Sequence, residues 1–107
     1  MKVIIDVDVT GGFHLSKECI LALGGKVEEG ENGNYWTELP EKFEHVDDIR
    51  LRTDPLLIKL VEEKGSKWCS KYETILKIVE IPDGVDFYID YCEGRGECIV
   101  EKHRVWR

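Results

Sequence analysis

The sequence has no long hydrophobic run. Its 107 residues contain no stretch that approaches the roughly 18 apolar residues of a membrane-spanning helix. The carboxylates of Asp6 and Asp8 interrupt the apolar run near the start, so no secretory signal is visible either. We therefore expect no membrane segment and a protein of the cytoplasm.

Basic residues are scarce. There are 15 lysines and arginines against 22 aspartates and glutamates, and the formal net charge is -7. A protein that coats duplex nucleic acid needs a basic face that displaces counterions, so this class is excluded. A hydrophobic content of 42% favours a folded soluble domain over a disordered acidic tail, and the length suffices for one core. We expect a single domain over residues 1–107.

Short cysteine spacings are also lacking. The four cysteines, Cys19, Cys69, Cys92 and Cys98, form no Cys-x-x-Cys pair. A structural zinc site is expected to bring such pairs. We therefore expect no metal, no other cofactor, and cysteines that are buried or half-buried thiols. Cys92 and Cys98 could still face each other across a hairpin, which leaves a disulfide between them conceivable.

Most of the negative charge lies in one segment. Residues 25–48 contain eight acidic residues and two lysines, so they carry -6 of the formal -7. The segment is rich in Gly, Asn and Glu, which is typical of a surface insertion, and residues 35–37 are expected to add a short strand. The rest of the chain is nearly neutral, and residues 102–107 are basic. This composition is compatible with a local site for a small anion.

Hydrophobic patterns predict the order of the elements. Residues 2–9 alternate between apolar and polar side chains, as a half-buried strand does. We expect three further strands over residues 75–81, 85–92 and 98–106, and helices over residues 17–23 and 55–64. These elements predict an α+β fold, in which an antiparallel sheet, made of the N-terminal strand and a C-terminal three-strand meander, packs with two helices.

Charge pairing suggests a register for the C-terminal hairpin. If Tyr91 lies opposite Ile99, Asp86 faces Arg104, which is a favourable cross-strand pair. A slip by one residue gives poorer pairs, so we expect the first register.

Asp6 and Asp8 follow a hydrophobic strand and have the outline of the haloacid-dehalogenase phosphatase signature. In that signature the first Asp is a nucleophile and the second a general acid, both beside Mg²⁺. The rest of the pattern is missing, because no later apolar strand ends in a metal-binding Asp pair. The favoured interpretation is two aspartates on the solvent face of a strand, and we expect no enzyme.

Several residues could hold an anion. Residues 11–16 lie between a strand and a helix start, where exposed amides and the Ser16 hydroxyl can hold a phosphate, although a tight turn with ordinary capping explains the same residues and is the favoured interpretation. Arg52, Lys102 and Arg104 offer cationic donors, and Arg104 could instead pair with Asp86. Aromatic walls could come from Phe13, Tyr88, Tyr91 and Trp106.

Four blocks of the sequence resemble blocks shared by small proteins of bacteriophages and prophages, in particular the first Thoeris anti-defence family, the phage "sponges". These blocks are GGFHLS at 11–16, RTDPLLI at 52–58, KIVEIPDGV at 77–85 and EKHRVW at 101–106. They lie along most of the chain apart from residues 25–48 and 66–74. The last block is the most specific and the first the least.

The resemblance implies a protein that binds a cyclic ADP-ribose isomer, made by a host immune sensor, without cleaving it. It also implies possible uptake of cyclic oligonucleotides at a separate site, assembly from dimers, and action in the cytoplasm of the infected bacterium. By matched block and aromatic wall, the expected ligand-binding residues are Gly11, Gly12, Phe13, Ser16, Arg52, Tyr91, Lys102 and Arg104. The alternative is an acidic inhibitor or nucleic-acid mimic, in which residues 25–48 block a host defence protein.

Overall fold

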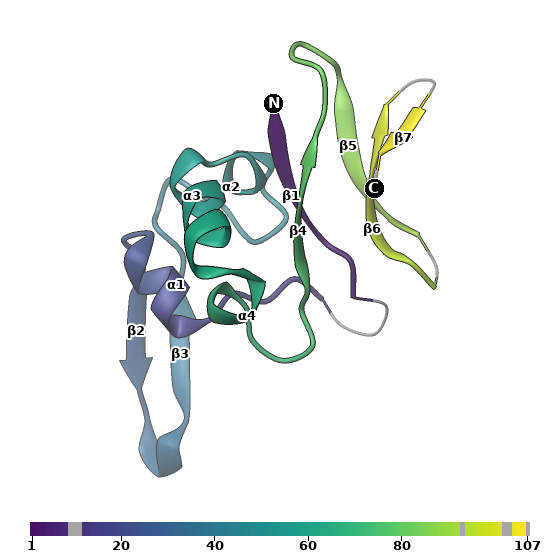
Figure 1. Cartoon of the computed structure of the whole chain (residues 1–107). Coiled ribbons are helices and arrows are strands. Elements are labelled where there is room, and N and C mark those ends of the chain that lie inside the picture. Colours follow the sequence, from purple (N-terminus) through teal and green to yellow (C-terminus); the bar gives the residue numbers. More distant parts are fainter. Residues whose placement is uncertain (9–11, 93, 102–103, 107) are drawn as a thin grey trace.

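The computed structural model of the chain describes residues 1–8, 12–92, 94–101 and 104–106 (Figure 1). The strands are β1 (Lys2–Asp6), β2 (Lys26–Glu29), β3 (Tyr35–Glu38), β4 (Leu76–Glu80), β5 (Phe87–Cys92), β6 (Gly96–Glu101) and β7 (Arg104–Trp106). The helices are α1 (Lys17–Ala22), α2 (Ile49–Arg52), α3 (Pro55–Lys64) and α4 (Ser66–Cys69), and Glu31–Gly33 form a 3-10 turn. The predicted α+β fold with antiparallel sheets is confirmed. No helix among these residues is long and apolar enough to cross a membrane.

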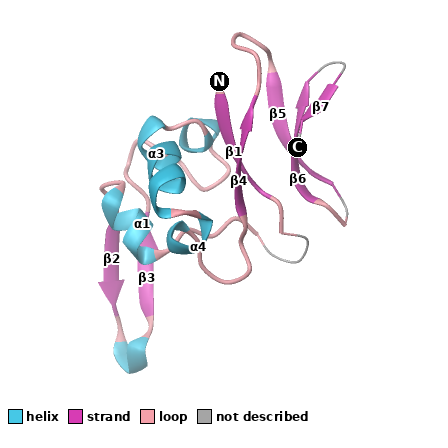
Figure 2. Ribbon diagram, viewed as in Figure 1, coloured by secondary structure: helices cyan, strands magenta, loops and turns pink. Residues whose placement is uncertain are grey.

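The elements form three layers (Figure 2). The middle layer is β1 paired with β4, with the helices on one side and the sheet β5–β6–β7 on the other. The N-terminal strand and the C-terminal strands therefore come together as two stacked sheets. The two expected helices are α1 and α3, and the short helices α2 and α4 were not expected. Within the acidic insertion, β2 and β3 form a separate hairpin.

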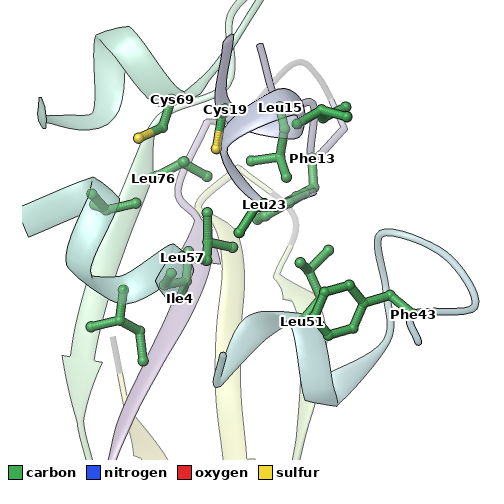
Figure 3. Packing of buried hydrophobic residues seen from close by; sticks show 13 residues of the cluster. Ile4, Phe13, Leu15, Cys19, Leu23, Phe43, Leu51, Leu57, Cys69 and Leu76 are labelled. Carbon is green, nitrogen blue, oxygen red and sulfur yellow. The ribbon is translucent and has the colours of Figure 1, made fainter. Parts of the chain in front are cut away.

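Strand β1 is buried on both faces, which explains its run of apolar residues. Ile4 belongs to the core beneath the helices, with Leu57 and Leu15 (Figure 3). Val3 and Ile5 point the other way and pack with Ile99 between the two sheets. The half-buried strand predicted over residues 2–9 is thus shorter, Lys2–Asp6, and is covered on both faces.

Local signals set the limits of helix α3. The Asp54 carboxylate accepts a hydrogen bond from the Leu57 amide at 3.1 Å, and Pro55 occupies the first turn, where its missing amide costs nothing. Gly65 ends the helix with φ 88°, a conformation that favours glycine. This helix has the bounds that the sequence predicts.

The register of the β5–β6 hairpin differs from the expected one by two residues. Tyr91 lies opposite Glu97, and Ile99 lies opposite Ile89. The turn is shorter than expected, because Gly96 adopts φ 76° and already begins β6. The predicted strand 98–106 is also divided, so that Arg104 in β7 lies opposite Glu101 and not Asp86. Cross-strand charge pairs contribute only about 0.2–1 kcal/mol each, too little to decide a register.

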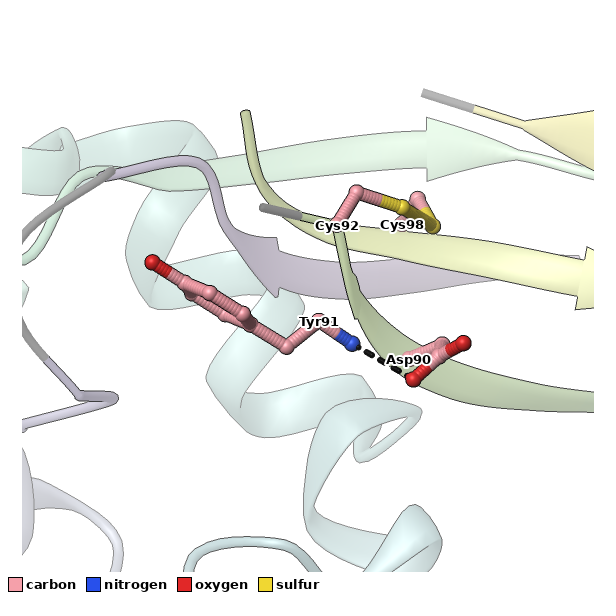
Figure 4. The surroundings of a disulfide bond; sticks show 4 residues. All are labelled: Asp90, Tyr91, Cys92 and Cys98. Atoms are coloured by element: carbon pink, nitrogen blue, oxygen red, sulfur yellow. Dashed lines mark hydrogen bonds between the residues drawn. A yellow bond between two sulfur atoms is a disulfide. The ribbon is translucent and has the colours of Figure 1, made fainter. Parts of the chain in front are cut away.

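A disulfide joins Cys92 and Cys98 across this hairpin, with 6.4 Å between the Cα atoms (Figure 4). The expectation of free thiols is therefore wrong for this pair. It holds for Cys19 and Cys69, which are buried in the core as free thiols. Burial raises the pKa of the Cys19 thiol far above its ordinary value, so that it stays protonated.

A buried ion pair connects the layers. The Arg52 side chain, 1% exposed, donates to the two carboxylate oxygens of Glu97 at 2.6 and 3.0 Å. It also donates to the carbonyl of Ile4 at 3.3 Å, while Glu97 Oε1 accepts from the Asp6 amide at 2.7 Å. These contacts satisfy backbone groups of β1 on the side away from β4. The ion pair thus occupies the position at which a further strand would otherwise pair with β1.

Removing one charge of this pair should be costly. In Glu97→Gln the amide still accepts from the Asp6 amide, but the buried Arg52 guanidinium loses its two short contacts and keeps only the exposed Asp47 carboxylate, at 3.4 Å, as a charged partner among the described residues. We expect the free energy of unfolding to fall by about 3–5 kcal/mol in urea titrations. The exposed Glu63→Gln, which removes the same charge from α3, should change it by less than about 0.5 kcal/mol.

A second substitution tests the cause. Adding Arg52→Met to Glu97→Gln removes the stranded charge, so the double variant should be more stable than Glu97→Gln alone. A double variant that is less stable would show that Arg52 acts through its other hydrogen bonds and not through the ion pair.

Candidate functional site

Two of the expected ligand-binding residues are engaged by the fold. Arg52 is held by Glu97 and also donates to the Val46 carbonyl at 2.8 Å. The Ser16 hydroxyl accepts from the Cys19 amide at 3.1 Å and donates to the Trp68 carbonyl at 2.7 Å. Ser16 is therefore the N-cap of α1, as the capping interpretation of residues 11–16 predicts. Both side chains are buried.

Of the other expected residues, the three that the structure describes in full, Gly12, Phe13 and Tyr91, do not line a common cavity. Gly11 and Lys102 lie outside the described residues, as does the side chain of Arg104. Gly12 is exposed and Phe13 is buried in the loop before α1, where the Phe13 ring lies 3.7 Å from the Arg52 guanidinium carbon. Tyr91 is exposed on β5, and both Tyr91 and Arg52 line a cavity beside this strand.

Asp6 and Asp8 are not on a solvent face. Both are buried, with Asp6 only 2% exposed, so the favoured interpretation of this pair is wrong. Asp6 Oδ1 accepts from the Ile75 amide at 2.9 Å and from the Asp8 amide at 3.0 Å. These bonds anchor the end of β1 to the segment before β4. Burial raises the pKa of Asp6, because the charged carboxylate is poorly solvated there.

Five residues that the sequence did not single out as a group form what we call the cation–aromatic cluster: His14, Lys17, Tyr35, Lys71 and Tyr72. Lys71 Nζ lies 4.9 Å from the centre of the Tyr35 ring and 4.8 Å from that of Tyr72. Lys17 Nζ lies 5.4 Å from the Tyr35 ring, and His14 meets Tyr72 edge-on at 5.2 Å. These are cation–π distances, so both ammonium groups lie against the Tyr35 ring, and that of Lys71 also lies against Tyr72.

A cavity of about 500 Å³ adjoins this cluster. His14 and Lys71 belong to both, and Phe13 and Phe43 supply buried aromatic walls. The remaining lining residues come from the loop before α1, from α1, from β3 with the following Leu39, and from the segment 43–46. The volume lies within the range of about 300–1,000 Å³ typical of small-molecule sites.

The loop before α1 is fixed by hydrogen bonds to the segment after α4. The His14 amide donates to Thr74 Oγ1 at 3.0 Å, and that hydroxyl donates to the Gly12 carbonyl at 2.7 Å. The Lys71 amide donates to the His14 carbonyl at 3.2 Å. The backbone of His14 and that of Lys71 are therefore held in place beside the cavity.

Tyr72 is presented to solvent. It adopts φ 59°, in the left-handed region that non-glycine residues seldom occupy, and its side chain is 78% exposed. A large exposed ring beside the Lys71 ammonium group offers a stacking surface for a planar ligand. Sequence reasoning missed it because residues 66–74 show no clear periodicity, and the only signal is the adjacent Lys71–Tyr72 pair.

No protein-family model matches the chain, and no curated protein or solved structure is significantly similar to it. The function is therefore inferred from the groups that this site presents, because a fold alone does not determine function. Those groups are the ammonium groups of Lys17 and Lys71, two imidazoles and several aromatic rings, and the cavity lining also includes the carboxylates of Glu38 and Glu44. The cations and rings suit an anion that carries a planar ring, whereas the two carboxylates oppose one.

Asp6 offers a test that separates a structural role from a catalytic one. Asp6→Ala leaves two amides without an acceptor and should lower the free energy of unfolding by about 1–3 kcal/mol. Asp6→Asn keeps the acceptor and removes the poorly solvated charge, so it should be at least as stable as the wild type at pH 7.

The pH dependence follows from the raised pKa. Asp6 binds its proton more tightly in the folded state, so its charge disfavours folding above the folded pKa, and this effect disappears below about 3.8, the unfolded value. The advantage of Asp6→Asn should thus shrink as the pH falls towards 3, measured by urea titration. An advantage that grows with acid would contradict the role assigned to burial.

Proposed function

We propose that the protein is a non-enzymatic binding protein that takes up a small nucleotide signal, such as a cyclic ADP-ribose isomer, and holds it intact. The observation that carries this proposal is the cation–aromatic cluster beside its cavity. Lys17 and Lys71 both lie against the Tyr35 ring, so two positive charges border one ring of a chain whose net charge is -7. Ammonium groups of this kind can pair with the oxygens of a pyrophosphate.

The rings suit the other half of a nucleotide. A purine can stack on the exposed Tyr72 or enter the cavity against Phe43, since both present an aromatic face. The bonded loop supports tight binding, because little conformational entropy is lost when a ligand enters a preformed site. Binding without turnover requires no more than these groups.

The biological setting of the proposal comes from the sequence resemblance. Under it, the protein is a phage anti-defence sponge that acts in the host cytoplasm, sequesters an immune signal and starves the effector. The block 11–16 of that resemblance supplies His14 to the cluster, whereas Arg52 of the second block serves the fold. Cyclic oligonucleotides are the second ligand class to be tried.

We also propose that the protein self-associates. Large apolar side chains are exposed on several elements, including Trp36 at 63% and Ile75 at 51%. Such side chains are commonly covered in homodimers. Light scattering of the purified protein would give the mass directly.

Ligand screening tests the proposed function. Cyclic ADP-ribose isomers and cyclic dinucleotides should raise the melting temperature in proportion to the logarithm of ligand excess, and heating should release the ligand unchanged by mass spectrometry. Lys71→Ala removes a charge-assisted contact and should weaken binding about 10-fold or more. The matched control Lys59→Ala, exposed on α3, should bind like the wild type. Recovery of hydrolysed ligand, or equal affinity in both variants, would contradict the proposal.

The acidic inhibitor is the second candidate function, and one observation favours it. The hairpin β2–β3 extends away from the helices (Figure 1), and on one face Glu28 lies opposite the exposed Trp36, with the exposed Glu38 beside it. Carboxylates around an aromatic anchor suit a basic groove.

Neutralising this surface separates the two candidates. A variant in which Glu28, Glu29, Glu31, Glu41 and Glu44 are replaced by Gln should lose all anti-defence activity in infected cells if the acidic surface acts. It should retain activity and nucleotide binding if the sponge function is the relevant one. Circular dichroism would confirm that the variant is folded.

A further inference from the structure

A second cavity, of about 510 Å³, runs along the edge of strand β5. It is lined by the five consecutive residues 87–91, together with residues from the segment 47–52 and Glu97 of β6. Successive side chains of a strand point to opposite faces, so a cavity that touches all five follows the edge of the strand. Among the described strands, only β6 pairs with β5, which leaves this edge facing the cavity. We call this cavity the β5 groove.

The groove combines exposed rings with negative charge. Tyr88 and Tyr91 are 58% and 53% exposed, and Asp47 and Asp90 are exposed carboxylates beside them. The cation in the lining, Arg52, is paired with Glu97 at 2.6 Å and also lies 3.4 Å from Asp47 Oδ1. The lining thus holds three carboxylates and a single cation. Since Glu97 neutralises Arg52, the carboxylates of Asp47 and Asp90 remain as excess negative charge. The groove therefore disfavours phosphates and favours an ammonium or guanidinium group, which can lie on a ring and pair with a carboxylate.

The position of the Asp90 carboxylate bears on what can bind at the open edge of β5. Asp90 Oδ1 accepts from the Tyr91 amide at 2.9 Å, so its carboxylate lies beside the backbone of the edge strand (Figure 4). A charged residue at such a position commonly protects an edge from unwanted pairing. Protection of the edge would need only the charge of Asp90. It does not explain why the groove also contains two exposed tyrosines and Ile49, which is 40% exposed, and these side chains are suited to contact a bound chain.

We propose that the β5 groove binds an extended, basic segment of a partner protein, which adds as a strand alongside β5 and places arginine or lysine side chains among Tyr88, Asp90 and Asp47. Main-chain hydrogen bonds to the edge would provide affinity, and the acidic, aromatic lining would provide selectivity. A second copy of the chain fits less well, because it would set Asp47 and Asp90 against their own counterparts. This site is separate from the cation–aromatic cluster.

The test uses the full chain, labelled with ¹⁵N, and a blocked peptide of three Arg-Val repeats as the probe. Backbone resonances of residues 47–52 and 87–92 should shift on titration. Asp90→Asn and Tyr88→Ala should each weaken binding about threefold or more, since an ion pair and a cation–π contact are lost. Tyr88→Phe keeps the ring and should bind like the wild type, as should Glu63→Gln, which removes one charge far from the groove.

Several results would overturn the proposal. One is no binding of the peptide, and another is equal weakening by Asp90→Asn and Glu63→Gln, which would indicate attraction by net charge alone. Shifts confined to the hairpin 26–38 would move the site there. Shifts of residues 87–92 on dilution without peptide would identify a second copy as the occupant. Loss of nucleotide binding in Lys71→Ala leaves these outcomes unchanged, so the two proposals can fail independently.

Discussion

The ion pair between Arg52 and Glu97 is the interaction on which the arrangement of layers depends. Its arginine comes from the helical layer and its glutamate from the outer sheet, and both contact the backbone of β1 between them. A charge buried to 1% exposure is tolerated only when its donors are satisfied, and here two carboxylates, those of Glu97 and Asp47, and two carbonyls, those of Ile4 and Val46, satisfy them. The middle sheet can consequently remain two-stranded without a bare edge at this point.

The ion pair is connected to the candidate site by the contact between Arg52 and Phe13, which lines the cavity. The Arg52 guanidinium stacks on the Phe13 ring, which fixes the loop before α1 from below, while Thr74 fixes it from the other side. His14 therefore occupies a defined position next to Tyr72. An arginine that sequence reasoning assigns to the ligand thus supports the residues that surround the cavity.

Much of the fold could be predicted from the sequence, because the signals were local. The alternation of β1 and the Asp54–Pro55 start of α3 depend on neighbouring residues, and both elements occur where expected. The partner of Arg52 was not predictable, since Glu97 lies 45 positions away and a lone arginine looks alike whether it is buried or exposed. The hairpin register failed for a related reason: weak charge pairs were weighed, whereas Gly96 determined where the strand began. Most of the candidate site was missed because Tyr35 and Lys71 come together only through tertiary packing.

The Tyr35 ring has a consequence for the acidic insertion. The ring stands on β3, inside the segment that gives the chain nearly all of its negative charge, and yet Lys17 and Lys71 rest against it. The insertion is therefore part of the candidate site. Its carboxylates repel anions at long range, whereas its Tyr35 ring contacts the ammonium groups of Lys17 and Lys71. A chain shortened by that hairpin would be more neutral and a poorer host for an anion, opposite to what its overall charge alone would suggest.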